Sequence, residues 1–143
     1  MPQGFTLLEA LLSVSVVAIL ALVAFPISIQ FQNRTGLDIA SYSFTQSLRS
    51  AQTLAQASSG DSSWGVKADT GSILLFKGSS YASRDTAYDQ ISSIYESIIL
   101  SGVTEVIFAK FTGLPQTTGT LILTSPNNET RSVTINSKGT VSY

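Results

Sequence analysis

The residues that could support chemistry are few, and their types argue against catalysis. The chain of 143 residues contains no His and no Cys. Thiol nucleophiles, disulfides and the common zinc sites are therefore excluded, and the side chain best suited to proton transfer near neutral pH is missing. Ser is abundant, but no G-x-S-x-G motif is present. We expect a protein that is not an enzyme and that holds no cofactor.

Two acidic residues, Asp85 and Asp89, are the remaining candidates for a metal site. They lie four positions apart in a predicted polar loop, beside Tyr81 and Tyr88. Their carboxylates could bind a cation, but nothing like the spacing of an EF-hand loop surrounds them. We expect them to be solvated acids, and we predict no metal site.

One further ionisable side chain stands out by its surroundings. Glu9 lies near the beginning of an apolar segment that runs from Phe5 to about Ile29, and no charged residue follows it before Arg34. As a helix, such a segment can cross the ~30 Å hydrocarbon core of a membrane. A carboxylate inside lipid is costly unless it is paired or protonated, so it indicates a function by default.

Two simple explanations of this segment are weaker than a specific one. A cleaved secretory signal needs a basic region before the apolar run, and residues 1–3 contain no Lys or Arg. A plain membrane anchor explains the length of the segment but gives no reason for Glu9.

The specific explanation comes from a resemblance. The segment GFTLLE, which begins at Gly4, resembles the processing site of type IV prepilins. The resemblance implies that residues 1–4 are a leader, that a membrane peptidase cuts between Gly4 and Phe5, and that the new amino terminus of Phe5 is methylated. The leader departs from the family pattern because it lacks a basic residue, so the efficiency of cleavage stays open.

The same resemblance gives expected roles to Glu9 and Pro26. After cleavage, Glu9 of one subunit could neutralise the cationic amine of Phe5 in a neighbour and so set the axial register of an apolar filament core. We therefore expect Glu9 to be an assembly residue. Pro26 removes a backbone hydrogen bond, so the helix should kink or loosen there. Membrane helices also tolerate proline, and the sequence leaves open whether Pro26 is merely tolerated or lets the helix stretch during assembly.

A second apolar pattern follows the first. Beyond Gly36, a weak point in a helix, apolar residues recur at spacings of three and four, at Leu37, Ala40, Phe44, Leu48, Ala51 and Ala55. This spacing predicts an amphipathic helix whose stripe packs as core, ending near Gly60. We expect one helix over residues 5–58, divided into a transmembrane and filament-core part at 5–33 and a head helix at 37–58, within a globular head at 34–143.

The rest of the head reads as short strands. Apolar runs between turn signals predict strands at residues 64–68, 72–77, 95–100, 105–111, 120–124, 131–135 and 140–143, with a polar loop at 78–89. Several strands after one long helix predict an α+β pilin fold in which the helix packs on an antiparallel sheet.

The whole chain also resembles one group within the pilin superfamily. The segments LRSAQTLAQAS, WGV, VIFAKFTGLP and INSKGTVSY are similar to the GspH/FimT group of minor pilins and pseudopilins. This implies a structural subunit of a type IV pilus-like filament, most simply a minor pilin. A type II secretion pseudopilin, a major pilin and a DNA-binding tip subunit stay open. The implied partners are other pilin subunits, the prepilin peptidase, the inner-membrane assembly platform and, before assembly, membrane lipid. The implied location is the inner membrane of a bacterium and then a periplasmic or extracellular filament.

The low content of charged residues makes DNA the least expected of these partners. Charged residues are 12% of the chain, against ~25% in ordinary soluble domains, and the net charge is −1. Some FimT-group members bind DNA through basic residues near the carboxyl end, where this chain has only Arg131 and Lys138. That is a small electrostatic footprint for nucleic acid.

Overall fold

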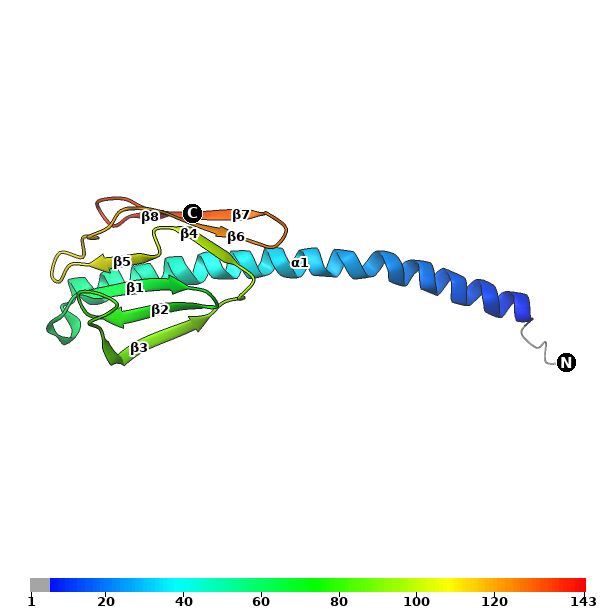
Figure 1. Ribbon diagram of the computed structural model, residues 1–143, viewed down its shortest axis with the longest axis horizontal. Coiled ribbons are helices and arrows are strands. Elements are labelled where there is room, and N and C mark those ends of the chain that lie inside the picture. The colour runs from blue at the N-terminus through cyan, green and yellow to red at the C-terminus, as the bar shows by residue number, and fades with distance from the viewer. Residues whose placement is uncertain (1–5) are drawn as a thin grey trace.

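A single long helix runs through both parts of the molecule. The computed structural model describes residues 6–143, except that the side chains of residues 23–30 lie outside the description. Helix α1, Leu7–Gln56, has 50 residues. Its first half projects as a rod beyond the rest of the chain, and its second half is covered by β-strands (Figure 1). The protein is therefore a rod joined to a head by continuous helix.

Both ends of α1 are defined by local backbone geometry. Thr6 has an extended backbone and caps the first turn, because its hydroxyl accepts a hydrogen bond from the N–H of Glu9 at 3.3 Å. At the other end, Ser58 adopts a left-handed conformation with φ 51°, and a short 3₁₀ turn, η1 Ser59–Asp61, follows. The left-handed residue that ends the helix is therefore Ser58, and Gly60, the expected cap, lies inside the 3₁₀ turn.

The strands of the head form two antiparallel sheets. They are β1 Trp64–Asp69, β2 Ser72–Lys77, β3 Asp85–Ser93, β4 Ile99–Gly102, β5 Glu105–Phe108, β6 Gly119–Thr124, β7 Thr130–Ile135 and β8 Val141–Ser142. One four-stranded sheet has the order β3-β2-β1-β5, and the other has the order β4-β6-β7-β8. The predicted α+β class is confirmed, but the strands are divided between two sheets that flank α1 (Figure 1).

The core lies where the two sheets meet the helix. In the strands that pack on α1, alternate residues point toward the helix, as the pleat of a strand requires. In β6, for example, Leu121 and Leu123 are fully buried while Ile122 between them is exposed. The facing residues of the first sheet are Val66, Val106 and Phe108. Each sheet thus covers one flank of the second half of α1.

Three predicted elements differ from the observed ones. The expected polar loop at residues 78–89 is wrong in its last part, because β3 begins at Asp85 and pairs along β2. The strand expected at 95–100 is displaced to β4, because Ile98 is buried in the connection before it. The strand expected at 105–111 ends at Phe108, beyond which the chain folds back toward the end of α1.

Candidate assembly helix

The projecting half of α1 is apolar and uncovered by the rest of the chain. Every residue from Thr6 to Leu22 is exposed. The large apolar side chains among them are Leu7, Leu8, Leu11, Leu12, Val14, Val16, Val17, Ile19, Leu20 and Leu22. A contiguous apolar surface of this extent is unusual on a soluble monomer and marks a site of contact with protein or lipid.

Glu9 lies in the first turn of this rod. Its side chain is exposed, and it lies in the first turn of the helix, where acidic residues are common. The spacing of Thr6 and Glu9 is that of a capping box, a signal that sequence reasoning missed although Thr-x-x-Glu is readable in the sequence. The backbone N–H of Glu9 therefore takes part in the helix cap, and the role of its carboxylate in assembly stays a prediction.

Three other predicted features lie wholly or partly outside the described residues. Gly4 and Phe5, the expected cleavage site, are not among them, and neither is the side chain of Pro26, although the backbone at position 26 is within α1. Among the described residues, no helix is apolar over a long enough stretch to cross a membrane. The expected span at 5–33 includes residue 5 and the side chains of 23–30, so it stays a prediction.

The second half of α1 is anchored through one face. Leu37, Phe44, Leu48, Ala51 and Ala55, the residues expected to pack as core, each have 0% of their surface exposed. The small side chains of Ala51 and Ala55 belong to the same buried cluster as Val66 and Phe108 of the first sheet. The rod is therefore continuous with the best-packed element of the head.

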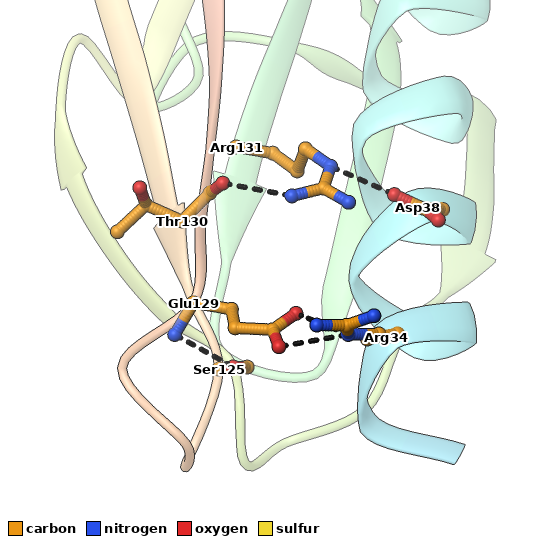
Figure 2. A network of polar contacts seen from close by, with 6 residues as sticks. All are labelled: Arg34, Asp38, Ser125, Glu129, Thr130 and Arg131. Atoms are coloured by element: carbon orange, nitrogen blue, oxygen red, sulfur yellow. Dashed lines mark hydrogen bonds and ion pairs between the residues drawn. The ribbon is translucent and has the colours of Figure 1, made fainter. Parts of the chain in front are cut away.

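Polar contacts fix the place where the rod enters the head. Figure 2 shows Arg34 and Asp38, one helical turn apart on α1, facing Glu129 and Arg131 at the start of β7. The Arg34 Nε donates to both Glu129 carboxylate oxygens, at 2.8 and 3.1 Å. The Arg131 Nε donates to the Asp38 Oδ1 at 2.8 Å. On α1 the basic residue comes first and the acidic one second, whereas on the hairpin the acidic residue comes first. Only one register of the hairpin against the helix therefore brings both pairs together.

Each of these ion pairs is exposed to water, so neither holds the head together. Exposed pairs contribute ~0–1 kcal/mol. The backbone N–H of Glu129 also donates to the Ser125 hydroxyl at 3.2 Å, which fixes the turn that presents the carboxylate. These contacts therefore join the β6–β7 hairpin to α1 and contribute little to the stability of the head.

Gly36 has a packing role at the same place. The ring of Tyr95 lies against it so closely that an added Cβ would come within 2.5 Å of the ring. The glycine that looks like a weak point in the helix therefore allows the β3–β4 connection to pack against α1.

Several other polar groups of the head also have partners within the chain. The Asp89 carboxylate pairs with the Arg84 Nε at 2.9 Å, and an Asp85 oxygen accepts the N–H of Ala87. The hydrogen bond from the Lys110 ammonium, together with its charge, lowers the pKa of the Asp61 carboxyl. Within the described residues, no group of three or more acidic, His or Cys side chains is arranged to hold a metal ion.

Comparisons with known proteins bear on both parts of the molecule. The model of the prokaryotic N-terminal methylation motif matches residues 2–25. The solved structure of the minor pseudopilin EpsH from the type 2 secretion system of Vibrio cholerae matches with a TM-score of 0.54 and 17% sequence identity. The match covers 74% of this chain and 94% of EpsH. No curated protein matches the sequence at a significant level.

The motif confirms the predicted resemblance at the amino terminus, and the structural match confirms the predicted fold. The motif covers the segment that contains the expected cleavage site and most of the apolar rod. The structural match has low sequence identity, so it establishes the fold alone. The chain is thus pilin-like in both respects: an N-terminal methylation motif precedes the fold of a minor pseudopilin.

Proposed function

We propose that this protein is a non-enzymatic structural subunit of a type IV pilus-like filament. The observation that carries the proposal is the exposed apolar rod of α1, which lies within a methylation motif at residues 2–25 and continues into a folded head. Such a surface needs an apolar environment. Lipid provides one before assembly, and the helices of neighbouring subunits provide one afterwards.

The proposed processing follows from the motif. A prepilin peptidase cuts between Gly4 and Phe5 and methylates the amine of Phe5. The mature helix then begins with Phe5 and Thr6, and the cap that Thr6 provides to the Glu9 N–H is retained. The leader, residues 1–4, is lost without disturbing any contact described in the head.

Glu9 is proposed to form a contact between neighbouring subunits. In a filament core, its carboxylate pairs with the amine of Phe5 in an adjacent subunit. A buried charge is tolerated when it is paired, and removing one member of such a pair is strongly destabilising. The pairing therefore selects one axial register among the many that a purely apolar rod would allow.

We propose a minor rather than a major subunit, on the basis of the fold shared with a minor pseudopilin. The same likeness makes a type II secretion pseudopilin the second candidate. A DNA-binding tip subunit has less support, because Arg131 is engaged with Asp38 and Lys138 is then the remaining late cation. Relative abundance in purified filaments separates a minor from a major subunit.

The proposed partners and location follow from this assignment. The precursor lies in the inner membrane of a bacterium, in contact with lipid, the prepilin peptidase and the assembly platform. The mature subunit is incorporated with other pilins into a periplasmic or extracellular filament.

The test is the intact mass of the protein recovered from membranes and from sheared filaments. We expect a species that lacks residues 1–4 and carries one extra methyl group, present in both fractions. A Gly4→Val variant, which places a branched side chain at the cut, should stay uncleaved in the membrane and be absent from filaments.

The contrary result is equally clear. If the wild-type chain has the full precursor mass in every fraction, the processing assignment is wrong and α1 is an ordinary anchor. If the processed chain is recovered from membranes but never from sheared filaments, the filament assignment is wrong.

A further inference from the structure

The two sheets of the head are joined by a segment that changes sheets at a kink. Strand β4 belongs to the second sheet, and β5, which follows after two connecting residues, belongs to the first (Figure 1). The kink lies at Gly102, whose φ is +87°. A side chain would be strained in this conformation, and an added Cβ would also clash with the carbonyl oxygen of Thr120. Because of the kink, β4 does not continue along β1 as β5 does.

A groove opens where β4 turns away from β1. The last backbone hydrogen bond between β1 and this segment runs from the Ala68 N–H to the Thr104 carbonyl, at 2.8 Å. Beyond it lies what we call the seam groove, which has a volume of about 410 Å³ and is lined by Asp69 at the end of β1 and by Ile99 and Leu100 of β4. Its volume is within the usual range of ligand-binding clefts.

The edge of β4 that borders the seam groove is less protected than the other sheet edges. The edge of β5 is covered, because the Gln116 N–H donates to the Ile107 carbonyl at 2.8 Å. The edge of β3 follows an irregular register, and the Asp85 carboxylate accepts the N–H of Ala87 there. Strand β8 has only two residues. Strand β4 pairs with β6 on one side, and no described residue pairs with its backbone on the other. Such an edge is a template for a further strand.

The side chains around the seam groove are apolar and acidic. Ile99, on the free edge of β4, has 67% of its surface exposed. Lys67 is paired with Glu105 at 3.8 Å, whereas Asp69 and Glu96, which also line the groove, take part in no ion pair among the described residues. These two acids leave the groove negative. The groove therefore complements a strand that carries basic and apolar side chains.

We propose that the seam groove binds an extended, basic segment of a different filament subunit, which adds to β4 as a further strand of the second sheet. The inference rests on the proposed filament function and names one surface through which the subunit meets its neighbours. A minor subunit has mostly other pilins as neighbours, so the occupant is a different chain. Backbone hydrogen bonds to β4 provide affinity. Basic side chains that pair with Asp69 and Glu96, and an apolar one that packs on Ile99, provide specificity.

The test measures binding of a short synthetic peptide, in which Val alternates with Lys, to the full-length protein in detergent micelles. Fluorescence anisotropy of the labelled peptide gives the affinity. Ile99→Lys places a cation on the free edge of β4, a device that natural edge strands use against pairing, and should weaken binding by about tenfold or more. Ile91→Lys is the matched control, because Ile91 is 68% exposed and lies on the other long edge, β3. It should leave the affinity unchanged.

A second pair of variants tests the charges of the groove. Glu96→Gln removes one of the two unpaired acids and should weaken binding of the Val–Lys peptide, whereas Asp85→Asn removes an acid at the start of β3 and should not. A peptide in which Val alternates with Glu should bind the wild-type protein more weakly than the Val–Lys peptide. All four side chains changed are exposed, so the melting temperatures should stay near that of the wild type.

The same lysine variants connect the groove to the filament. Ile99→Lys should be processed normally and yet be lost from sheared filaments, whereas Ile91→Lys should be retained. If the wild-type protein does not bind the Val–Lys peptide at millimolar concentration, or if the two lysine variants bind it equally, the groove is not a strand-binding site. If Ile99→Lys loses the peptide but is recovered normally from filaments, the occupant is not a filament subunit.

These outcomes are separate from failure of the proposed function. Intact mass and filament recovery of the wild-type chain report that function without any peptide. A processed wild-type chain in filaments, together with equal binding by the two lysine variants, overturns only the seam groove. An unprocessed wild-type chain that is absent from filaments overturns the proposed function, and with it the filament subunit as occupant.

Discussion

Both halves of α1 are helical, but only the second half packs against the rest of the chain. Between Leu37 and Ala55, an apolar stripe is fully buried under two sheets. From Leu7 to Leu22, apolar side chains surround the helix and every one is exposed. The second half of α1 therefore finds its partner within the subunit, whereas the described residues of the first half have none there.

The pattern of polar residues explains why the halves differ. The second half alternates its apolar stripe with Ser, Gln and Arg, so one face packs and the other meets water. The first half is apolar all round, with Glu9 as its single charge, so no orientation on the head could bury it. A helix in a protein gains most of its stability from packing, so we propose that lipid or neighbouring helices support the rod.

The largest effect is expected from a charge placed in the buried stripe. Phe44→Asp puts a carboxylate between α1 and the sheets without a partner, which costs several kcal/mol and should unfold the head. Gln46→Asp, on the exposed side of the same helix, should melt within a few degrees of wild type. Circular dichroism melting of both variants checks this. A wild-type melt for Phe44→Asp would mean that the stripe is not core.

The same enlargement made in both halves should have different consequences. Ala51→Leu forces extra volume against a packed sheet and should destabilise the head by about 1–3 kcal/mol. Ala18→Leu adds the same volume to the exposed rod and should leave the unfolding of the head unchanged. Urea unfolding of the two variants measures the difference. Equal losses would show that the rod is packed against the head.

The smallest effect is expected at the junction of the two halves. A double-mutant cycle on Arg34→Ala and Glu129→Ala should give a coupling of about 0.2–1 kcal/mol, because the pair is exposed. The coupling should fall as salt rises, since ions screen exposed charges. A coupling well above this range would mean that the ion pair contributes more to the stability of the head than an exposed pair should.

The helix and most strands could be predicted from the sequence because their signals are local. The stripe from Leu37 to Ala55 repeats with the helical period, and the pairs β1–β2 and β6–β7 are adjacent apolar runs joined by turn residues. The expected helix over 5–58 extends two residues beyond the end of α1 at Gln56, and residue 5 lies outside the described residues. The division into two sheets was not predicted, since it depends on which distant strands pair.

The remaining features carry weak or non-local signals. Strand β3 is exposed along almost its whole length, so it has no alternation of apolar residues to mark it. The contacts of Arg34 with Glu129 and of Arg131 with Asp38 join residues 95 and 93 positions apart, which no local spacing reveals. The left-handed conformation of Phe111 is equally hidden, because Phe is among the residues least suited to it.

The most direct test of the central claim concerns Glu9. Glu9→Ala removes the carboxylate from the rod, and we expect it to abolish incorporation into filaments while processing and the melting temperature of the head stay unchanged. Thr6→Ala is the matched control. It weakens the helix cap by about 1 kcal/mol but keeps the carboxylate, so it should still assemble.

The measurement is the fraction of each variant recovered from sheared filaments relative to membranes. We expect Glu9→Ala to be absent from sheared filaments and Thr6→Ala to be recovered from them. Normal recovery of Glu9→Ala would contradict the account, because the rod would then assemble without the charge that sets its register. Equal loss of both variants would mean that assembly depends on an intact first turn and not specifically on the Glu9 carboxylate.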